Sequence, residues 1–302
     1  MASVQFGWGL PVGARHNRRA TFVADVERGL ALIRGHFDSA WVIDHLLMGD
    51  SDVLEAWTEL TFFAARHPGL RWGHAVLSQS FRNPALVAKM AASLHFLTGG
   101  QYILGLGAGW QEPEYRAYGY PFPPAGVRVD ELEEAVSVVK ALWGAPPATF
   151  VGRYYRVQEA LCEPRPDPRP IIMIGGEKPR MLRLVARHAD WWNVSWTGIA
   201  DYRAQVAEME RACADVGRDP ATLRRTWHGG CACAPTAAQA QALATPRFAG
   251  GNAFLGTPAQ VIEQMQPFVD MGVDYFQLSC AGFPDLTSLE MLVGEVLPAL
   301  HR

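Results

Sequence analysis

Residues 81–136 read FRNPALVAKMAASLHFLTGGQYILGLGAGWQEPEYRAYGYPFPPAGVRVDELEEAV, and no other stretch says as much about the fold class. The Asn83–Pro84 pair is typical of a helix start and predicts a helix over residues 83–97. A short apolar run at 102–106 predicts a buried strand. The apolar stripe over 127–142 predicts the next helix. The stretch is therefore a helix–strand–helix segment of a repeating α/β chain.

The same alternation of strand and helix continues on both sides of this stretch. Apolar runs that predict strands lie at residues 4–10, 40–43, 71–78, 102–106, 171–174, 190–194, 223–233 and 273–278. Each run precedes a segment with helical spacing, and such alternation implies a parallel sheet with right-handed crossovers. Eight units of this kind predict an α/β fold, the (β/α)8 TIM barrel. The alternative that the pattern leaves open is a doubly wound open sheet.

Residues 144–170 interrupt the repeat. They are rich in proline, and residues 149–157 within them predict a small hairpin. We therefore expect an insertion after the fourth βα unit, and one hypothesis is that it covers the active site as a lid. No linker is long enough to separate a second domain, so residues 1–302 are expected to form a single barrel domain.

Composition and charge narrow the range of functions. The 27 Lys and Arg and 30 Asp and Glu give a formal net charge of −3, which argues against nucleic-acid or membrane-surface partners. No apolar run approaches the roughly 20 residues that span a bilayer. The five cysteines are scattered, which favours a reducing, cytoplasmic location. Cys231 and Cys233 share a predicted strand without a second ligand pair, so no metal site is expected.

Polar residues and glycines gather at the carboxyl ends of the predicted strands, where barrels of this kind hold their active sites. Asp44 and His45 follow the second strand, and an unperturbed histidine pKa of about 6.5 suits proton transfer. The run 105–109 has the pattern GxGxG, which differs from the GxGxxG of dinucleotide folds. These glycines either allow a tight turn or let a flat ring approach the backbone. Asp44 has a plainer alternative role, which is to stiffen its loop.

The turn after the fifth strand predicts an anion site. Gly175 and Gly176 precede a helix that starts at Pro179, so free amides and the helix dipole would face a phosphate. The alternative is an ordinary strand-to-helix turn. Ten tryptophans are many for this length, and several fall near strand ends, where together they would suit an aromatic cofactor.

Four segments resemble the luciferase-like oxidoreductases. They are FDSAWVIDHLL (37–47), the stretch 81–136, IIMIGGEKPRMLRLVARHADWWN (171–193) and GTPAQVIEQMQPFVDMGVDYFQL (256–278). The resemblance covers nearly the whole chain and implies a (β/α)8 barrel with an insertion. It also implies one of two cofactors, reduced FMN or the deazaflavin coenzyme F-420. Two shorter pieces, GAGWQEPEYRAYGYPFP and ADWWN, are most similar to the F-420-dependent branch.

The resemblance also implies roles for individual residues. It makes His45 and Asp44 the catalytic residues beside the ring, and it places a non-proline cis peptide bond between Ala75 and Val76, pressing on the ring face. The remaining cofactor-binding residues that it implies are Ser78, Gly107, Gly109 and Trp110 in the pocket, Glu114 and Arg128 near its rim, and Gly175, Gly176, Glu177 and Lys178 at the phosphate. The expected substrate-binding residues are Trp8, Ser195 and Trp196.

One position departs from part of the family. Sugar-phosphate dehydrogenases of this family place a glutamate where this chain has Trp110, so a sugar phosphate is not the expected substrate. We expect hydride transfer between F-420 and a small organic molecule, with His45 as the proton donor or acceptor. The alternatives are a reduced-FMN-dependent monooxygenase and a flavin-binding protein without catalysis. Family members are commonly homodimers, so a homodimer is the expected assembly.

Overall fold

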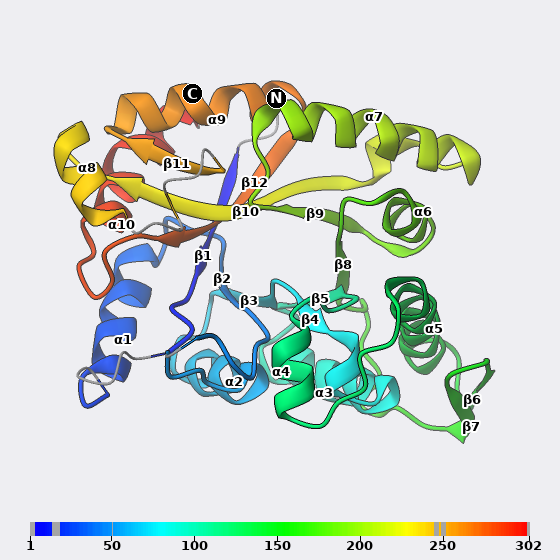
Figure 1. The fold of residues 1–302 in the computed structure, drawn as a ribbon. Coiled ribbons are helices and arrows are strands. Elements are labelled where there is room, and N and C mark those ends of the chain that lie inside the picture. The colour runs from blue at the N-terminus through cyan, green and yellow to red at the C-terminus, as the bar shows by residue number, and fades with distance from the viewer. Residues whose placement is uncertain (1–3, 14–18, 50, 245–247, 249–251, 301–302) are drawn as a thin grey trace.

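The barrel wall is one sheet of parallel strands (Figure 1). The computed structural model describes residues 4–13, 19–49, 51–244, 248 and 252–300. The sheet closes on itself because β9 pairs with β10. In order around the wall the strands are β1 (Gln5–Gly9), β2 (Ser39–Val42), β3 (Arg71–His74), β5 (Tyr102–Gly107), β8 (Ile171–Gly175), β9 (Trp191–Ser195), β10 (Arg224–Cys233) and β12 (Val273–Cys280). Closure confirms the predicted (β/α)8 barrel and rules out the open sheet.

Two short strands extend the wall at its carboxyl end. β4 (Leu77–Ser78) pairs with β5 and continues β3 after a break at residues 75–76, which the sequence pattern had joined into one strand. β11 (Ala253–Gly256) pairs with the second half of β10, whose first half pairs with β9. The carboxyl half of β10 therefore has an additional neighbouring strand.

Helices cover the outside of the wall (Figure 1). They are α1 (Phe22–Ile33), α2 (Ala56–Arg66), α3 (Pro84–Leu97), α5 (Ala125–Trp143), α6 (Pro179–His188), α7 (Ile199–Asp215), α9 (Pro258–Asp270), α10 (Thr287–Met291) and α11 (Leu297–Leu300), with a π-helical turn over Leu292–Val296. The sequence pattern did not predict α4 (Glu112–Ala117) or α8 (Ala237–Leu243). Among the residues described, no helix combines the length and apolar character needed to cross a bilayer.

The start of α2 differs from the sequence-based expectation. The sequence predicts Asp52 as the N-cap of a helix over residues 53–66, but the helix begins after Glu55, whose carboxylate accepts hydrogen bonds from the amides of Trp57 and Thr58. Asp52 pairs with Arg19 instead, with oxygen–nitrogen distances of 2.6 Å. Aspartate is a preferred cap and glutamate is not, so residue preference pointed to the wrong acid.

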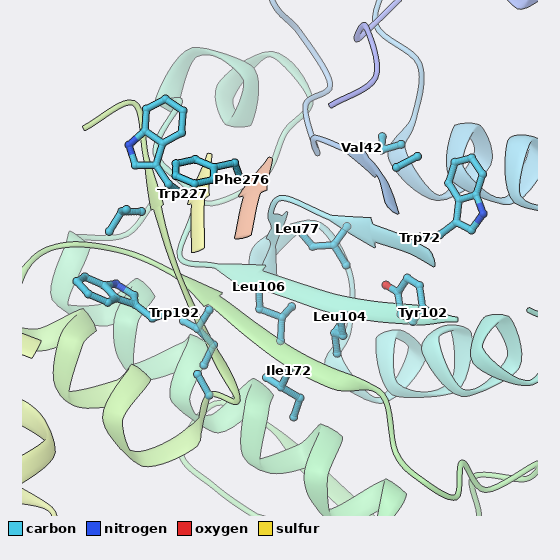
Figure 2. Packing of buried hydrophobic residues seen from close by; sticks show 14 of the residues in the cluster. Val42, Trp72, Leu77, Tyr102, Leu104, Leu106, Ile172, Trp192, Trp227 and Phe276 are labelled. Carbon is cyan, nitrogen blue, oxygen red and sulfur yellow. The ribbon is translucent and has the colours of Figure 1, made fainter. Parts of the chain in front are cut away.

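The core has two layers because side chains alternate between the faces of each strand. One layer fills the barrel interior and contains Trp41, Ile103, Met173 and Tyr275. The other lies between wall and helices, and Figure 2 shows part of it. Labelled members of that outer layer are Val42, Trp72, Leu77, Tyr102, Leu104, Leu106, Ile172, Trp192, Trp227 and Phe276. Trp41 fits inside because Gly7 and Gly73, where a Cβ atom would meet its ring at 2.2–2.3 Å, leave room for it.

The insertion contains the expected hairpin, formed by β6 (Ala148–Val151) and β7 (Arg156–Ala160). The hairpin packs on α5, where the Glu134 carboxylate accepts hydrogen bonds from the amides of residues 153–155. Its tip also reaches the segment after β4, since Tyr155 donates a hydrogen bond to Gln79 Oε1 at 2.9 Å. These contacts place the hairpin against the outer flank of α5. The hypothesis that the insertion acts as a lid stays a prediction.

Candidate active site

The break between β3 and β4 creates a ridge at the carboxyl end of the barrel. The peptide bond Ala75–Val76 is cis, as the family resemblance implied. The Val76 side chain projects between the ends of β5 and β8: a Cβ atom at Gly107 would lie 2.6 Å from Val76 Cγ2, and one at Gly175 would lie 3.3 Å from Val76 Cγ1. Glycine at both positions therefore makes room for the Val76 side chain, which lies against the ends of β5 and β8.

Gly109 fits its place only as glycine. Its φ is +74°, and a Cβ atom there would lie 1.8 Å from Tyr115 Oη and 2.9 Å from Ser78 Oγ. Ser78 and Tyr115 are joined by a short hydrogen bond between their hydroxyls. All three glycines in the run 105–109 are thus required by contacts with the β3–β4 segment or α4, since a Cβ atom at Gly105 would lie 1.8 Å from His74 O.

His45 follows Asp44, whose carboxylate accepts the Ser78 amide, and it is oriented by a buried carboxylate. Its Nδ1 is 3.0 and 3.2 Å from the two oxygens of Glu114, which also accepts hydrogen bonds from the amides of Leu46 and Leu47. Because an ionised carboxylate can only accept, Nδ1 is the donor to Glu114, and Nε2 is the ring nitrogen left to face other partners. The Glu114 side chain is 3% exposed, whereas that of His45 is 11% exposed. The family resemblance implied a place for Glu114 at the cofactor rim, and its contacts make it the residue that orients His45.

Asp44 does not occupy the position that was expected of a catalytic residue. Its side chain is fully buried, and its two oxygens accept hydrogen bonds from Arg82 at 2.8 and 3.0 Å and from the Ser78 amide at 2.9 Å. Burial raises the pKa of the Asp44 carboxyl, and the bonds from Arg82 oppose that rise. Because these partners enclose the carboxylate, the assignment of Asp44 as a catalytic residue is wrong. Asp44 holds its loop in place, which is the alternative role given above.

The turn before α6 differs in detail from the anion site that was expected. No side chain caps the helix, which leaves its first amides to other acceptors. The Gly176 amide donates to Asn193 O at 3.1 Å, so it is already used within the fold. The Glu177 carboxylate accepts from Gln205 and lies 3.3 Å from Lys178 Nζ, on the exposed surface. An anion at this turn would therefore meet the amides after Gly176 and the Lys178 ammonium.

Two further predicted residues lie at the rim. Trp110 is 71% exposed and stands edge-on to the His45 ring, with centroids 5.8 Å apart. Arg128 stacks on Phe122 at 3.9 Å and donates to Pro123 O, while its buried Nε has no hydrogen-bond partner among the described residues. Trp110 thus offers an aromatic wall next to His45, and Arg128 offers an unused donor.

Trp8 is not at the site. Its side chain is 2% exposed and packs in the outer layer, where a Cβ atom at Gly29 of α1 would lie 2.2 Å from its ring. Strand alternation explains the error: Phe6 and Trp8 share the outer face of β1, so Gly7 and Gly9 face the interior. Its proposed role in substrate binding is therefore withdrawn.

Ser195 and Trp196 do lie at the carboxyl end of β9. Ser195 is exposed and its hydroxyl donates to Asn193 Oδ1 at 3.2 Å. Trp196 has a φ of +51°, its amide donates to His228 O at 2.7 Å, and its ring lies edge-on to Phe248 at 5.7 Å. The two residues therefore form a mixed polar and aromatic surface on this part of the barrel rim.

Sequence reasoning missed three residues of this region. Arg82 links Asp44 to Glu55, His228 lies 3.4 Å from Ser195 Oγ, and Gln277 accepts from Asn193 inside the barrel at 2.7 Å. Because side chains alternate along a strand, the sequence could have predicted that His228 and Gln277 face the barrel interior. No local pattern distinguished Arg82.

Two other features lie away from this site. Grooves of about 710 and 410 Å³ open at the opposite, amino ends of the strands, around Arg224 and Arg225 and around Arg34 and Asp38. Within the described part of the chain, no group of three or more histidine, cysteine or acidic side chains is placed to hold a metal ion.

The family is shown by a comparison with family models. The model described as luciferase-like monooxygenase matches residues 26–255, which is most of the chain. The chain belongs to this family. The cis peptide bond before Val76 and the glycines that contact its side chain lie at the carboxyl end of this luciferase-like barrel. We therefore take that end as the candidate active site.

Curated relatives match part of the chain. The phthiodiolone/phenolphthiodiolone dimycocerosates ketoreductase of Mycobacterium sp. (strain JLS) is 33% identical over 220 residues, 64% of this chain and 57% of that protein. The F420-dependent glucose-6-phosphate dehydrogenase of Kineococcus radiotolerans is 35% identical over 158 residues, 51% of this chain and 46% of that protein. The chain thus spans about half the length of the curated relatives it matches.

Solved structures share the whole fold at low identity. An F420-dependent secondary alcohol dehydrogenase in complex with an F420-acetone adduct has a TM-score of 0.83 at 19% identity, covering 99% of this chain and 100% of that one. The oxygenating constituent of 3,6-diketocamphane monooxygenase from Pseudomonas putida, in complex with FMN, has a TM-score of 0.78 at 16% identity, covering 98% of each. These likenesses support the barrel fold alone.

Proposed function

We propose that this protein is an F-420-dependent oxidoreductase that transfers hydride between the deazaflavin and a small organic substrate. The observation that carries the proposal is the His45–Glu114 pair at the end of the barrel that also carries Val76. In this proposal His45 would supply a proton-transferring nitrogen on the same barrel rim as Val76, against which the flat ring would lie. The curated relatives named as a ketoreductase and as an F420-dependent dehydrogenase add support.

The residues at the barrel end fit a bound deazaflavin. Gly107 and Gly175 make room for the Val76 side chain, against which the ring would lie. Arg128 has a buried Nε that lacks a partner among the described residues, and this donor would suit a polar group of the cofactor. The start of α6 and Lys178 would hold a phosphate.

The chain's own contribution to the chemistry is positioning and proton transfer. When bound, F-420 would supply a two-electron hydride carrier. His45 would hold or release a proton at the substrate oxygen through Nε2, because Glu114 holds Nδ1 in its protonated form. Trp110 would cover the His45 side of the site and exclude water, and Trp196 would form a second aromatic wall.

The second candidate is an FMN-dependent monooxygenase. The observation that favours it is the solved FMN complex with the same barrel, together with the name of the matching family. The Val76 ridge does not discriminate between the two cofactors, because both present a flat tricyclic ring to it.

Titration separates these candidates. Purified protein would be mixed with F-420 and with FMN in separate fluorescence titrations, with Gly107→Val as the variant whose side chain would displace Val76. We expect saturable F-420 binding, at least tenfold tighter than FMN binding and lost in Gly107→Val. FMN binding without F-420 binding would favour the monooxygenase.

Catalysis is tested by His45→Ala. We expect the variant to bind F-420 as the wild type does and to lose F-420-dependent turnover with a panel of ketones, secondary alcohols and enones. If the wild type binds F-420 but oxidises or reduces nothing in that panel, the result would support the alternative of a flavin-binding protein without catalysis.

A further inference from the structure

Arg82 is a buried cation with two acidic partners from different elements. It follows the short helical turn Gln79–Phe81 and precedes α3, and 12% of its side chain is exposed. Its guanidinium holds both oxygens of Asp44, at 2.8 and 3.0 Å, and also contacts Glu55. Burial lowers the pKa of the Arg82 guanidinium, but the bonds and charges of Asp44 and Glu55 raise it above its usual value overall.

Each acidic partner fixes a different segment. Asp44 precedes His45 and accepts the Ser78 amide at 2.9 Å, so it ties the loop after β2 to the segment that follows Val76. Glu55 is the N-cap of α2, and although burial opposes its ionisation, the hydrogen bonds from Thr58 and Arg82 lower its pKa to about 2. One guanidinium therefore joins the His45 loop, the β4 segment and the start of α2.

The fork geometry of arginine suits this task. A guanidinium has five donors in a fixed plane, so it can hold two oxygens of one carboxylate and still reach a second acid. A lysine ammonium is one point charge on a flexible stem, so it cannot keep both oxygens of Asp44 and Glu55 in the same arrangement. Charge alone would therefore not reproduce the contacts of Arg82.

We propose that Arg82 is a positioning residue for the active site, holding the His45 loop and the Val76–Ser78 segment at a fixed separation. The inference rests on the proposed function, because it assigns the two segments to proton transfer and ring support. Arg82 itself touches neither Val76 nor His45 among the contacts of the structure, so it acts through Asp44.

The first test needs no cofactor. Hydrogen–deuterium exchange would be measured on the wild type, Arg82→Lys and the control Arg71→Lys, which alters a similar arginine–aspartate pair (3.2 Å to Asp38) at the amino end of the barrel. We expect exchange in peptides covering residues 43–48 and 76–81 to rise at least tenfold in Arg82→Lys only. Exchange that is unchanged in both peptides, or raised equally throughout the chain, would overturn the inference.

The second test asks whether the guanidinium itself is required. In Arg82→Ala, added ethylguanidinium should restore F-420 affinity, whereas ethylammonium at equal ionic strength should not. If Arg82→Ala does not fold, Arg82→Lys takes its place, with an F-420 dissociation constant expected at least tenfold above that of the wild type. A dissociation constant within twofold of the wild type, as expected for Arg71→Lys, would overturn the inference. Failure of the wild type to bind F-420 would instead count against the proposed function and leave the exchange result to decide the role of Arg82.

Discussion

Replacing Glu59 by glutamine should stabilise the protein, and more so as the pH rises. Glu59 lies on α2, is 3% exposed, and its Oε1 has no hydrogen-bond partner among the described residues. Burial raises its pKa from 4.5 to about 8. Glutamine keeps the shape and removes the ionisation, so the difference between the two proteins isolates the cost of placing this charge in the core.

The size and sign of the effect follow from linkage. Between pH 4.5 and about 8 the folded protein keeps a proton that the unfolded chain releases, so folding stability falls as the pH rises through that window. Each pKa unit corresponds to about 1.4 kcal/mol. The shift therefore sets a ceiling of ~5 kcal/mol above pH 8, and of ~3 kcal/mol at pH 7.

Urea unfolding followed by circular dichroism at pH 5, 7 and 9 measures this difference. The free energy of unfolding of Glu59→Gln should exceed that of the wild type by several kcal/mol more at pH 9 than at pH 5. Glu208→Gln is the control, since its carboxylate is 45% exposed and pairs with Arg211 at the surface. A difference between Glu59→Gln and wild type that stays constant over the three pH values would refute the reasoning.

Three other expectations concern the site and its surroundings. Gly109→Ala should destabilise the protein by ~1–3 kcal/mol more than Gly119→Ala, because both glycines have a φ of +74° but only at Gly109 would Cβ meet another atom within 4 Å; equal melting temperatures in calorimetry would contradict this. Glu114→Gln should move the His45 proton from Nδ1 to Nε2, since the amide can donate where the carboxylate accepts. The tautomer would be determined by ¹⁵N NMR of histidine-labelled protein. An unchanged spectrum would contradict the assigned role of Glu114. Trp8→Phe should lower the free energy of unfolding by ~1–2 kcal/mol and leave F-420 affinity within about twofold of the wild type, since Trp8 packs on Gly29 outside the barrel wall. Tenfold weaker F-420 binding would show that Trp8 contributes to the site.

Much of the fold follows from local sequence, because strand and helix periodicity are properties of short windows. The eight wall strands and the hairpin at 149–157 are examples. Contacts between segments far apart in the sequence are harder to predict, because no short window contains both partners. His45 and Glu114 are 69 positions apart, and Arg82 meets Asp44 and Glu55 across 38 and 27 positions. Asp44 was misassigned for the same reason: its position after a strand suggested catalysis, and only its enclosure by Arg82 and Ser78 showed otherwise.

A crystal structure of the protein soaked with F-420 would test the proposed site as a whole. The account predicts the deazaflavin ring on the Val76 ridge between the ends of β5 and β8, with His45 at its edge and a phosphate at the start of α6. A ring bound instead in the groove around Arg224 and Arg225, at the amino ends of the strands, would contradict it.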